Sequence, residues 1–202
     1  MAKPEKHEYR EAWLASATRK LGKTFFADNG LELPGKLQCS CGFPKARGGK
    51  AIGQCWNPAT SADGTTQMFI SPTLGNDVVS PQGVLPTLLH ELIHACVGTE
   101  AGHKGPFKKL MKQFGLQGKA TATLVEPGTE LHTKLNLIAG ELGPYPHAAM
   151  TPMKKEGRRG AMGGWVRLKS VTDERYKVLV SPKMIDECGM PRDPWGEEME
   201  PV

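Results

Sequence analysis

The chain has 202 residues, which suits one ordinary domain with a small appendage rather than two full domains. Hydrophobic residues make up 39% of it and charged residues 23%, a composition that excludes a wholly disordered chain. Twenty-six Lys and Arg against 21 Asp and Glu give a net charge of +5. This mild basic excess permits contact with nucleic acid without requiring it.

The sequence carries no signal for export or for a membrane. No apolar stretch approaches the ~18 residues of a membrane-spanning helix, and the charged N-terminus lacks the apolar segment of a signal peptide. Five cysteines are an odd number and do not suggest a disulfide framework. We therefore expect a cytoplasmic protein in a reducing compartment, with no membrane partner.

The N-terminal part of the chain predicts a helix followed by three short strands. The helix covers residues 8–27 and ends at Asn29-Gly30, because apolar side chains recur every four residues at Trp13, Ala17, Leu21 and Phe25. Residues 37–43 alternate between apolar and polar or small side chains, which is typical of a half-buried strand. Residues 51–56 and 66–70 give the other two strands.

Further helices are expected at about residues 85–97, 107–114 and 129–142. The first of them can begin in two ways: Pro86 lies in its first turn, or Pro86 kinks a helix that begins near Ser80. The Pro-rich segment 143–146 then interrupts the chain. We place a domain boundary there, so that residues 1–147 form one domain and residues 148–202 a small β-rich region.

The segment from residue 90 to 94 reads His-Glu-Leu-Ile-His. On a helix, residues four apart lie on one face, so His90 and His94 can both reach one ion at about 2.0–2.1 Å from each ring nitrogen. Glu91 need not bind the metal, because it can accept a proton from a water beside it. The motif therefore predicts a zinc site on a buried helix.

Two histidines leave a catalytic zinc site incomplete, since such a site usually has three protein ligands. The metzincin pattern is excluded, because Val97 and Glu100 occupy the positions of its Gly and third His. His103 is the better candidate, since a short loop between Gly98 and Pro106 can fold back toward the helix. A glutamate ligand stays open as the alternative, from Glu100, Glu126 or Glu130.

These residues resemble those of a known family. HELIHACVG followed by GHKGPFKKL is similar to the signature of the SprT/Spartan zinc metalloproteases, with Lys104 inserted in a GHGPxF-like segment. The wider pattern over roughly residues 8–147 resembles the short SprT-like proteins of bacteriophages. The resemblance implies His90, His94 and His103 as zinc ligands and Glu91 as the catalytic acid and base.

The same resemblance implies an α+β, zincin-like fold. In it, the helix that carries residues 90–94 would pack beneath a small, mostly antiparallel sheet. Many SprT-like proteins end in a zinc ribbon with paired cysteines, but residues 148–202 contain only Cys188. We therefore expect one zinc ion per chain. The C-terminal region would be a degenerate, ribbon-like β unit, packed through Trp165, Tyr176, Val178, Val180 and Trp195.

Other candidate residues favour ordinary structural roles. The spacing of Cys39, Cys41 and Cys55 fits no strong zinc pattern, and the first two share a predicted strand face with apolar residues, so core packing is favoured. Cys96 is expected to be a small core residue. Tyr145 and His147 could stabilise an oxyanion near the metal, but a structured Pro-rich turn is the favoured interpretation.

Lysine and arginine form three basic clusters, and DNA is one possible partner. The expectation of DNA binding depends more on the DNA-associated members of the family than on charge, and no aromatic residues interleave the basic runs as in a stacking platform. The clusters are Lys45/Arg47/Lys50, Lys104/Lys108/Lys109/Lys112 and Lys154/Lys155/Arg158/Arg159.

The function that these features predict is zinc-dependent hydrolysis of peptide bonds in protein substrates. Glu91 would accept a proton from the attacking water and pass it to the leaving amine, and a sheet edge could hold an extended substrate. Two alternatives stay open: a DNA-binding or scaffold protein with a structural zinc, and a zinc hydrolase of non-peptide amides. The presence of Glu91 favours catalysis, because a structural site does not need it.

Overall fold

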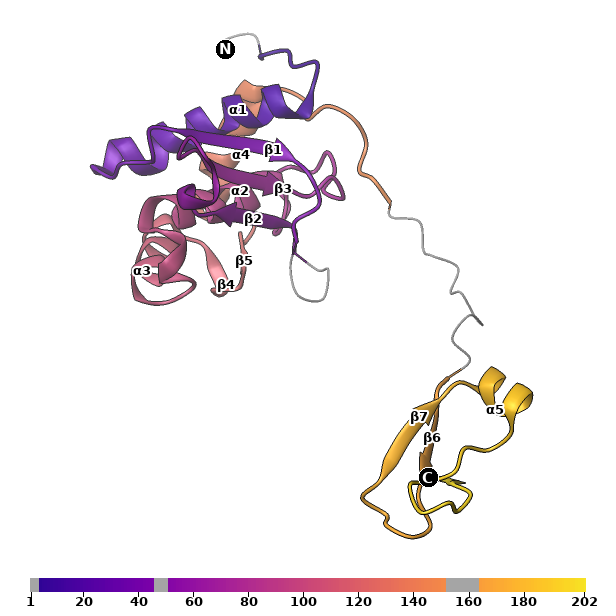
Figure 1. Ribbon diagram of the computed structural model, residues 1–202. Coiled ribbons are helices and arrows are strands. Elements are labelled where there is room, and N and C mark those ends of the chain that lie inside the picture. Colours follow the sequence, from indigo (N-terminus) through magenta and orange to yellow (C-terminus); the bar gives the residue numbers. More distant parts are fainter. Residues whose placement is uncertain (1–3, 46–50, 152–163) are drawn as a thin grey trace. The chain divides into compact units, whose positions relative to one another are not determined.

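The computed structural model describes residues 4–45, 51–151 and 164–202 (Figure 1). The chain divides into two compact units, residues 1–151 and residues 152–202. None of the helices within the described ranges is long and apolar enough to cross a membrane.

The predicted first helix is continuous but changes its winding. Helix α1 (Arg10–Leu21) passes into a π-helical turn at Gly22–Phe26 and a 3-10 turn at Ala27–Asn29. It ends where Gly30 adopts φ 68°, a left-handed conformation that glycine tolerates best. The predicted apolar stripe is buried along its length, which anchors the helix to the core.

The main sheet contains β1 (Leu37–Cys41), β2 (Gly53–Trp56) and β3 (Thr66–Ile70) in the order β1-β3-β2. Strand β3 pairs parallel with β1 and antiparallel with β2, so the sheet is mixed. The prediction of a mostly antiparallel sheet is therefore wrong here. Side-chain alternation shows which face of a strand is buried, but it does not show that β3 inserts between the two strands that precede it.

Helices α1 and α2 (Val84–Val97) contact one face of this sheet, as Figure 1 shows. The buried strand residues Cys39, Met68 and Ile70 join the core on that side. Pro86 lies in the first turn of α2, which resolves the two possible starts, and the helix ends at Gly98 as expected. Helix α4 (Glu130–Leu142) contacts α1 and α2 and adds Leu135 to the core.

Between α2 and α4, the chain forms helix α3 (Gly105–Phe114) and a hairpin of β4 (Gln117–Lys119) and β5 (Ala122–Leu124). Short 3-10 turns lie at Pro58–Thr60 and Thr99–Ala101. Sequence analysis missed the hairpin, since strands of three residues are too short to show an apolar period.

The C-terminal unit has a three-stranded antiparallel sheet and one helix. The strands are β6 (Val166–Lys169), β7 (Lys177–Val180) and β8 (Glu200–Pro201), in the order β7-β6-β8, and the helix is α5 (Pro182–Cys188). The expected aromatic packing is wrong, because Trp165, Tyr176 and Trp195 are 52%, 40% and 56% exposed. This small sheet instead buries Leu168 and Met199.

A buried polar pair accompanies that small core. Ser170 Oγ donates a hydrogen bond to Asp193 Oδ2 and accepts one from the backbone N–H of Thr172. Asp193 Oδ1 accepts from the backbone N–H groups of Trp195 (3.0 Å) and Glu197 (2.9 Å). The pair thus joins the end of β6 to the turn at residues 193–197.

Candidate metal centre

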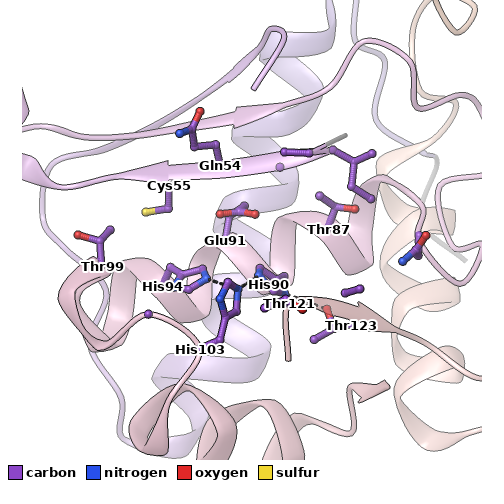
Figure 2. Close-up of a pocket in the computed structure, with 16 residues that line it drawn as sticks. Gln54, Cys55, Thr87, His90, Glu91, His94, Thr99, His103, Thr121 and Thr123 are labelled. Atoms are coloured by element: carbon purple, nitrogen blue, oxygen red, sulfur yellow. Dashed lines mark hydrogen bonds between the residues drawn. The ribbon is translucent and has the colours of Figure 1, made fainter. Parts of the chain in front are cut away.

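Three histidines meet on one side of α2. His90 and His94 project from successive turns of the helix, and His103 reaches them from the loop that follows (Figure 2). The Nε2 atom of His103 lies 3.2 Å from Nε2 of His90 and 3.2 Å from Nε2 of His94. All three ligand atoms lie within 4.8 Å of one another, so the cluster could hold a metal ion.

These separations fit zinc geometrically. Nitrogens about 2.0–2.1 Å from a common ion, at tetrahedral angles, lie about 3.3 Å apart. Both distances from His103 agree with that value. Three protein nitrogens would also leave one tetrahedral position on a bound ion open to another ligand.

The loop after α2 returns His103 to the helix because two glycines adopt positive φ. Gly98 has φ 84° and Gly102 has φ 50°, on either side of the 3-10 turn. The Nδ2 group of Asn57 donates hydrogen bonds to Thr99 Oγ1, at 3.2 Å, and to Glu100 Oε1, which ties the turn to the end of β2. Glu100 is therefore occupied in fixing the loop.

The ring of Phe107 packs against all three histidines of the cluster. Its ring centroid lies 4.8 Å from that of His90, 4.4 Å from that of His94 and 5.0 Å from that of His103. The ring is fully buried in the first turn of α3. The Gly-Pro-Phe segment after His103 thus has a physical role: it starts α3 and places one aromatic ring against all three imidazoles.

Thr123 orients the first histidine, and sequence reasoning missed it. Nδ1 of His90 lies 2.9 Å from Thr123 Oγ1, so when Nε2 serves as a metal ligand, Nδ1–H can donate to this hydroxyl. Such an outer partner selects the tautomer that leaves Nε2 free to bind metal. Thr123 comes from β5, in the hairpin that the sequence did not predict, so no local pattern could have identified it.

Burial keeps the histidines in the form that binds metal. It lowers the pKa of His90 to about 3 and that of His94 to about 4, and it lowers the pKa of His103 as well. The neighbouring imidazoles add to the effect at His90 and His94, because a second positive charge is unfavourable beside the first. At neutral pH all three side chains are therefore neutral ligands, and metal need not displace protons from them.

Glu91 lies in the same cleft, between α2 and β2 (Figure 2). It is 5% exposed, and this burial raises its pKa to about 8. The backbone of β2 passes close to it at Gly53, where a Cβ atom would lie 2.4 Å from Glu91 Oε1 and 2.7 Å from Thr87 Cγ2. Only glycine leaves room for the carboxyl group as it stands.

The cleft has a volume of about 470 Å³ and lies between two strands. Residues 51–55 of the β2 segment form one wall, and residues 121–123 of the hairpin form the other. Within the described part of the chain, β2 pairs only with β3, so its other edge is free. An extended chain can pair with such an edge.

The chain matches no family model. No curated protein and no solved structure matches it either. The resemblance to SprT-like proteases therefore depends on the motif residues alone.

The remaining candidate residues do not join the cluster. Glu126 and Glu130 are exposed and line no wall of the cleft, and Glu130 pairs with Lys134. Tyr145 is buried against Trp13, with ring centroids 4.9 Å apart, and lies outside the residues that line the cleft. His147 is exposed in the following turn with φ 65°. The structured-turn interpretation of this segment agrees with these positions.

Among the described residues, the cysteines do not belong to the three-histidine cluster. Cys39 is buried in the core and Cys41 packs against it, and neither belongs to a group of potential ligands among the described residues. Cys55 lines the cleft beside Glu91, where burial raises the pKa of its thiol to about 12. Cys96 is half-buried against the core and does not line the cleft.

The basic clusters are only partly described. Lys104, Lys108, Lys109 and Lys112 are exposed on α3, away from its buried face. Lys45 is exposed after β1. Six cluster residues lie outside the described ranges, including the whole C-terminal run: Arg47, Lys50, Lys154, Lys155, Arg158 and Arg159.

Proposed function

We propose that this chain is a SprT-like, zinc-dependent metalloendopeptidase that hydrolyses protein substrates. The observation that carries the proposal is the convergence of His90, His94, His103 and Glu91 in one cleft beside a free strand edge. The histidines supply neutral nitrogen ligands at zinc-like spacing, and Glu91 supplies a base that a structural zinc site would not need.

His90, His94 and His103 would hold the zinc ion, which would supply Lewis-acid chemistry at the cleft. Glu91 acts first as a general base and then as a general acid. Its ionised carboxylate accepts a proton from the attacking water, and the protonated acid then donates that proton to the leaving amine. Burial alone would keep Glu91 mostly protonated at neutral pH, because the charged form is poorly solvated in the cleft. A cation held by the histidines would favour the ionised carboxylate, which is the form that accepts the proton.

The substrate is an extended segment of polypeptide. Strand β2 offers backbone N–H and C=O groups along the cleft, so pairing would hold the substrate by its main chain. The wall residues Ala51, Gly53 and Ala122 are small. Among the described residues that line the cleft, the ionisable side chains are those of Glu91, the three histidines and Cys55. We therefore expect little preference for charged residues at the scissile bond.

The test combines metal analysis with proteolysis of unfolded protein substrates, with and without DNA. Wild type should bind one zinc per chain and cleave. Glu91→Gln should keep the zinc and the fold but lose at least about 10²–10⁴-fold in rate, since it cannot accept a proton. His94→Ala should lose both zinc and activity.

Two results would contradict the proposal. If Glu91→Gln cleaved every substrate at the wild-type rate, Glu91 would not be the general base. A zinc-loaded wild type that cleaves no protein with or without DNA would support the scaffold alternative, in which the metal stabilises the fold.

A further inference from the structure

Arg10, the first residue of α1, is a buried cation with no carboxylate beside it. Its side chain is 7% exposed, and within the described part of the chain no acidic group forms an ion pair with it. The guanidinium donates to three carbonyl oxygens instead, those of Pro146 at 3.2 Å, Pro72 at 3.4 Å and Ala148. These oxygens satisfy its N–H groups but leave its charge uncompensated, which is unfavourable in a protein interior.

The fourth partner of this guanidinium is the thiol of Cys41 at the end of β1. Nη1 of Arg10 lies 3.5 Å from Cys41 Sγ, and of the four groups that accept from Arg10 the thiol is the one that can ionise. A neighbouring cation stabilises the thiolate, which is the nucleophilic form of cysteine. Glu11 is the acidic group at this place, since its Oε1 accepts from the backbone N–H of Cys41 at 3.3 Å, but its side chain is exposed and screened by water.

Tyr145 adds a hydrogen-bond donor that has no acceptor. Its ring centroid lies 5.4 Å from Cζ of Arg10. The side chain is 3% exposed, and its hydroxyl has no hydrogen-bond partner among the described residues. Burial raises the pKa of Tyr145, and the neighbouring Cys41 adds to this effect. Because a buried hydroxyl without a partner is unfavourable, the site lacks an acceptor here as well as a negative charge.

An oxygen atom bound to the sulfur of Cys41 would meet both requirements. A thiol is only a weak hydrogen-bond acceptor and carries no charge. A sulfenate oxygen is an anion, so it would compensate the charge of Arg10 and accept strong hydrogen bonds from the guanidinium and from the hydroxyl of Tyr145. Cys41 is half-buried, so part of its surface is open to a small oxidant.

The other four cysteines do not share this environment. Burial raises the pKa of the thiols of Cys39 and Cys96, and it raises that of Cys55 to about 12. Buried thiols with raised pKa values are poor nucleophiles at neutral pH. Cys188 is exposed at the end of α5, in the other compact unit. The chain therefore contains its own comparison for the reactivity of Cys41.

We propose that Cys41 is a site of oxidation by hydroperoxides and that Arg10 and Tyr145 stabilise the sulfenate that forms. The thiolate sulfur attacks one oxygen of hydrogen peroxide, and an S–O bond forms as the O–O bond breaks. The leaving hydroxide takes up the proton that the thiol released, so sulfur loses two electrons and the second peroxide oxygen leaves as water. The sulfenic acid then releases its proton to solvent. This inference is independent of the proposed peptidase, since it needs neither the histidines nor Glu91.

The experiment treats the full chain with hydrogen peroxide in the presence of dimedone, a reagent that traps sulfenic acids. Mass spectrometry of the digested protein then measures the rate of labelling at each cysteine. Cys41 should be labelled at least about fivefold faster than Cys188, although Cys188 is more exposed. In urea this difference should vanish, because unfolding separates the thiol from the guanidinium.

Two substitutions test the partners of the sulfur. Arg10→Gln removes the cation, so labelling of Cys41 should fall to the rate of Cys188 or below. Tyr145→Phe removes only a hydroxyl without a partner, so the fold should persist. The Cys41 sulfenate should then disappear about threefold faster or more, because it loses one hydrogen bond. Its lifetime is measured by removing peroxide with catalase and varying the delay before dimedone is added. Tyr176→Phe, in the C-terminal unit, is the matched control and should leave this lifetime unchanged.

Three results would overturn the proposal. The first is labelling of Cys41 in the folded wild type that is no faster than that of Cys188. The second is a preference for Cys41 that persists in urea, which would assign it to the local sequence. The third is a folded Arg10→Gln that is labelled at the wild-type rate. If Arg10→Gln does not fold, Tyr145→Phe decides, and an unchanged sulfenate lifetime in that variant would count against the site.

Discussion

The backbone of Gly53 packs directly against the carboxyl group of Glu91. The Cα of Gly53 lies so close to the helix that an added Cβ would stand 2.4 Å from Glu91 Oε1. The carboxyl group proposed as the general base is thus positioned by a residue that carries no chemistry itself. Gly53 belongs to β2, whose pairing with β3 prevents the backbone from moving away.

We expect Gly53→Ala to reduce peptidase activity about 10²-fold while zinc binding is retained, because the methyl group displaces Glu91 but touches no histidine. The comparison measures kcat/KM and zinc content in parallel. Gly35→Ala is the control, since a Cβ there meets nothing within 4 Å and should leave both values unchanged. Full activity in Gly53→Ala would show that the position of Glu91 does not matter.

Thr123→Val should weaken zinc binding by about 10–100-fold, because His90 loses the acceptor that orients its ring and sets its tautomer. Competition with a chelator of known affinity measures this directly. Thr123→Ser keeps the hydroxyl and should restore most of the affinity. Equal weakening in both variants would assign the effect to packing of the hairpin instead of to the hydrogen bond.

Phe107→Leu should weaken zinc binding and broaden the histidine ring signals in NMR spectra, since a smaller, non-planar side chain no longer packs against three imidazoles. Removal of the whole ring in Phe107→Ala should cost about 3–5 kcal/mol of unfolding free energy. Leu110→Ala, on the same buried face of α3 but outside the cluster, should lower stability without a specific loss of metal. Identical zinc affinities for the two positions would contradict this role of Phe107.

Acid should destabilise the C-terminal unit through Asp193. The hydrogen bond from Ser170 and the backbone N–H groups favour the carboxylate, so the pKa of Asp193 lies below its ordinary value in the folded state. Its contribution is therefore present above the unfolded value of about 3.8 and is lost as pH falls through the lower folded pKa. Wild type should be more stable than Asp193→Asn at pH 7, and this difference should shrink toward pH 3.

Amide NMR signals of residues 164–202, followed through urea unfolding, measure that difference. Signals of residues 51–151 serve as the internal control, because the carboxylate of Asp193 is hydrogen-bonded to residues of the C-terminal unit, Ser170, Trp195 and Glu197. A difference between the two proteins that grows as the solution becomes more acidic would contradict the assignment.

Local patterns were sufficient for much of the first unit. The strand at residues 66–70, the end of α2 at Gly98 and the start of α3 at Gly105-Pro106 follow from alternation, glycine and proline, since each depends on residues close in sequence. His90 and His94 share a face for the same reason: helical geometry alone relates residues four apart. These features could be predicted without knowing which residues pack against them.

The sequence by itself therefore determined the helix that carries the metal motif, most element positions and the spacing that puts His90 and His94 on one helix face. Tertiary structure alone decided that β3 inserts between β1 and β2, that Thr123 contacts His90, and that Gly53 packs against Glu91. The reason is physical. Each of these contacts joins residues far apart in the chain, and their free energy depends on strand order and close packing, which no local periodicity encodes.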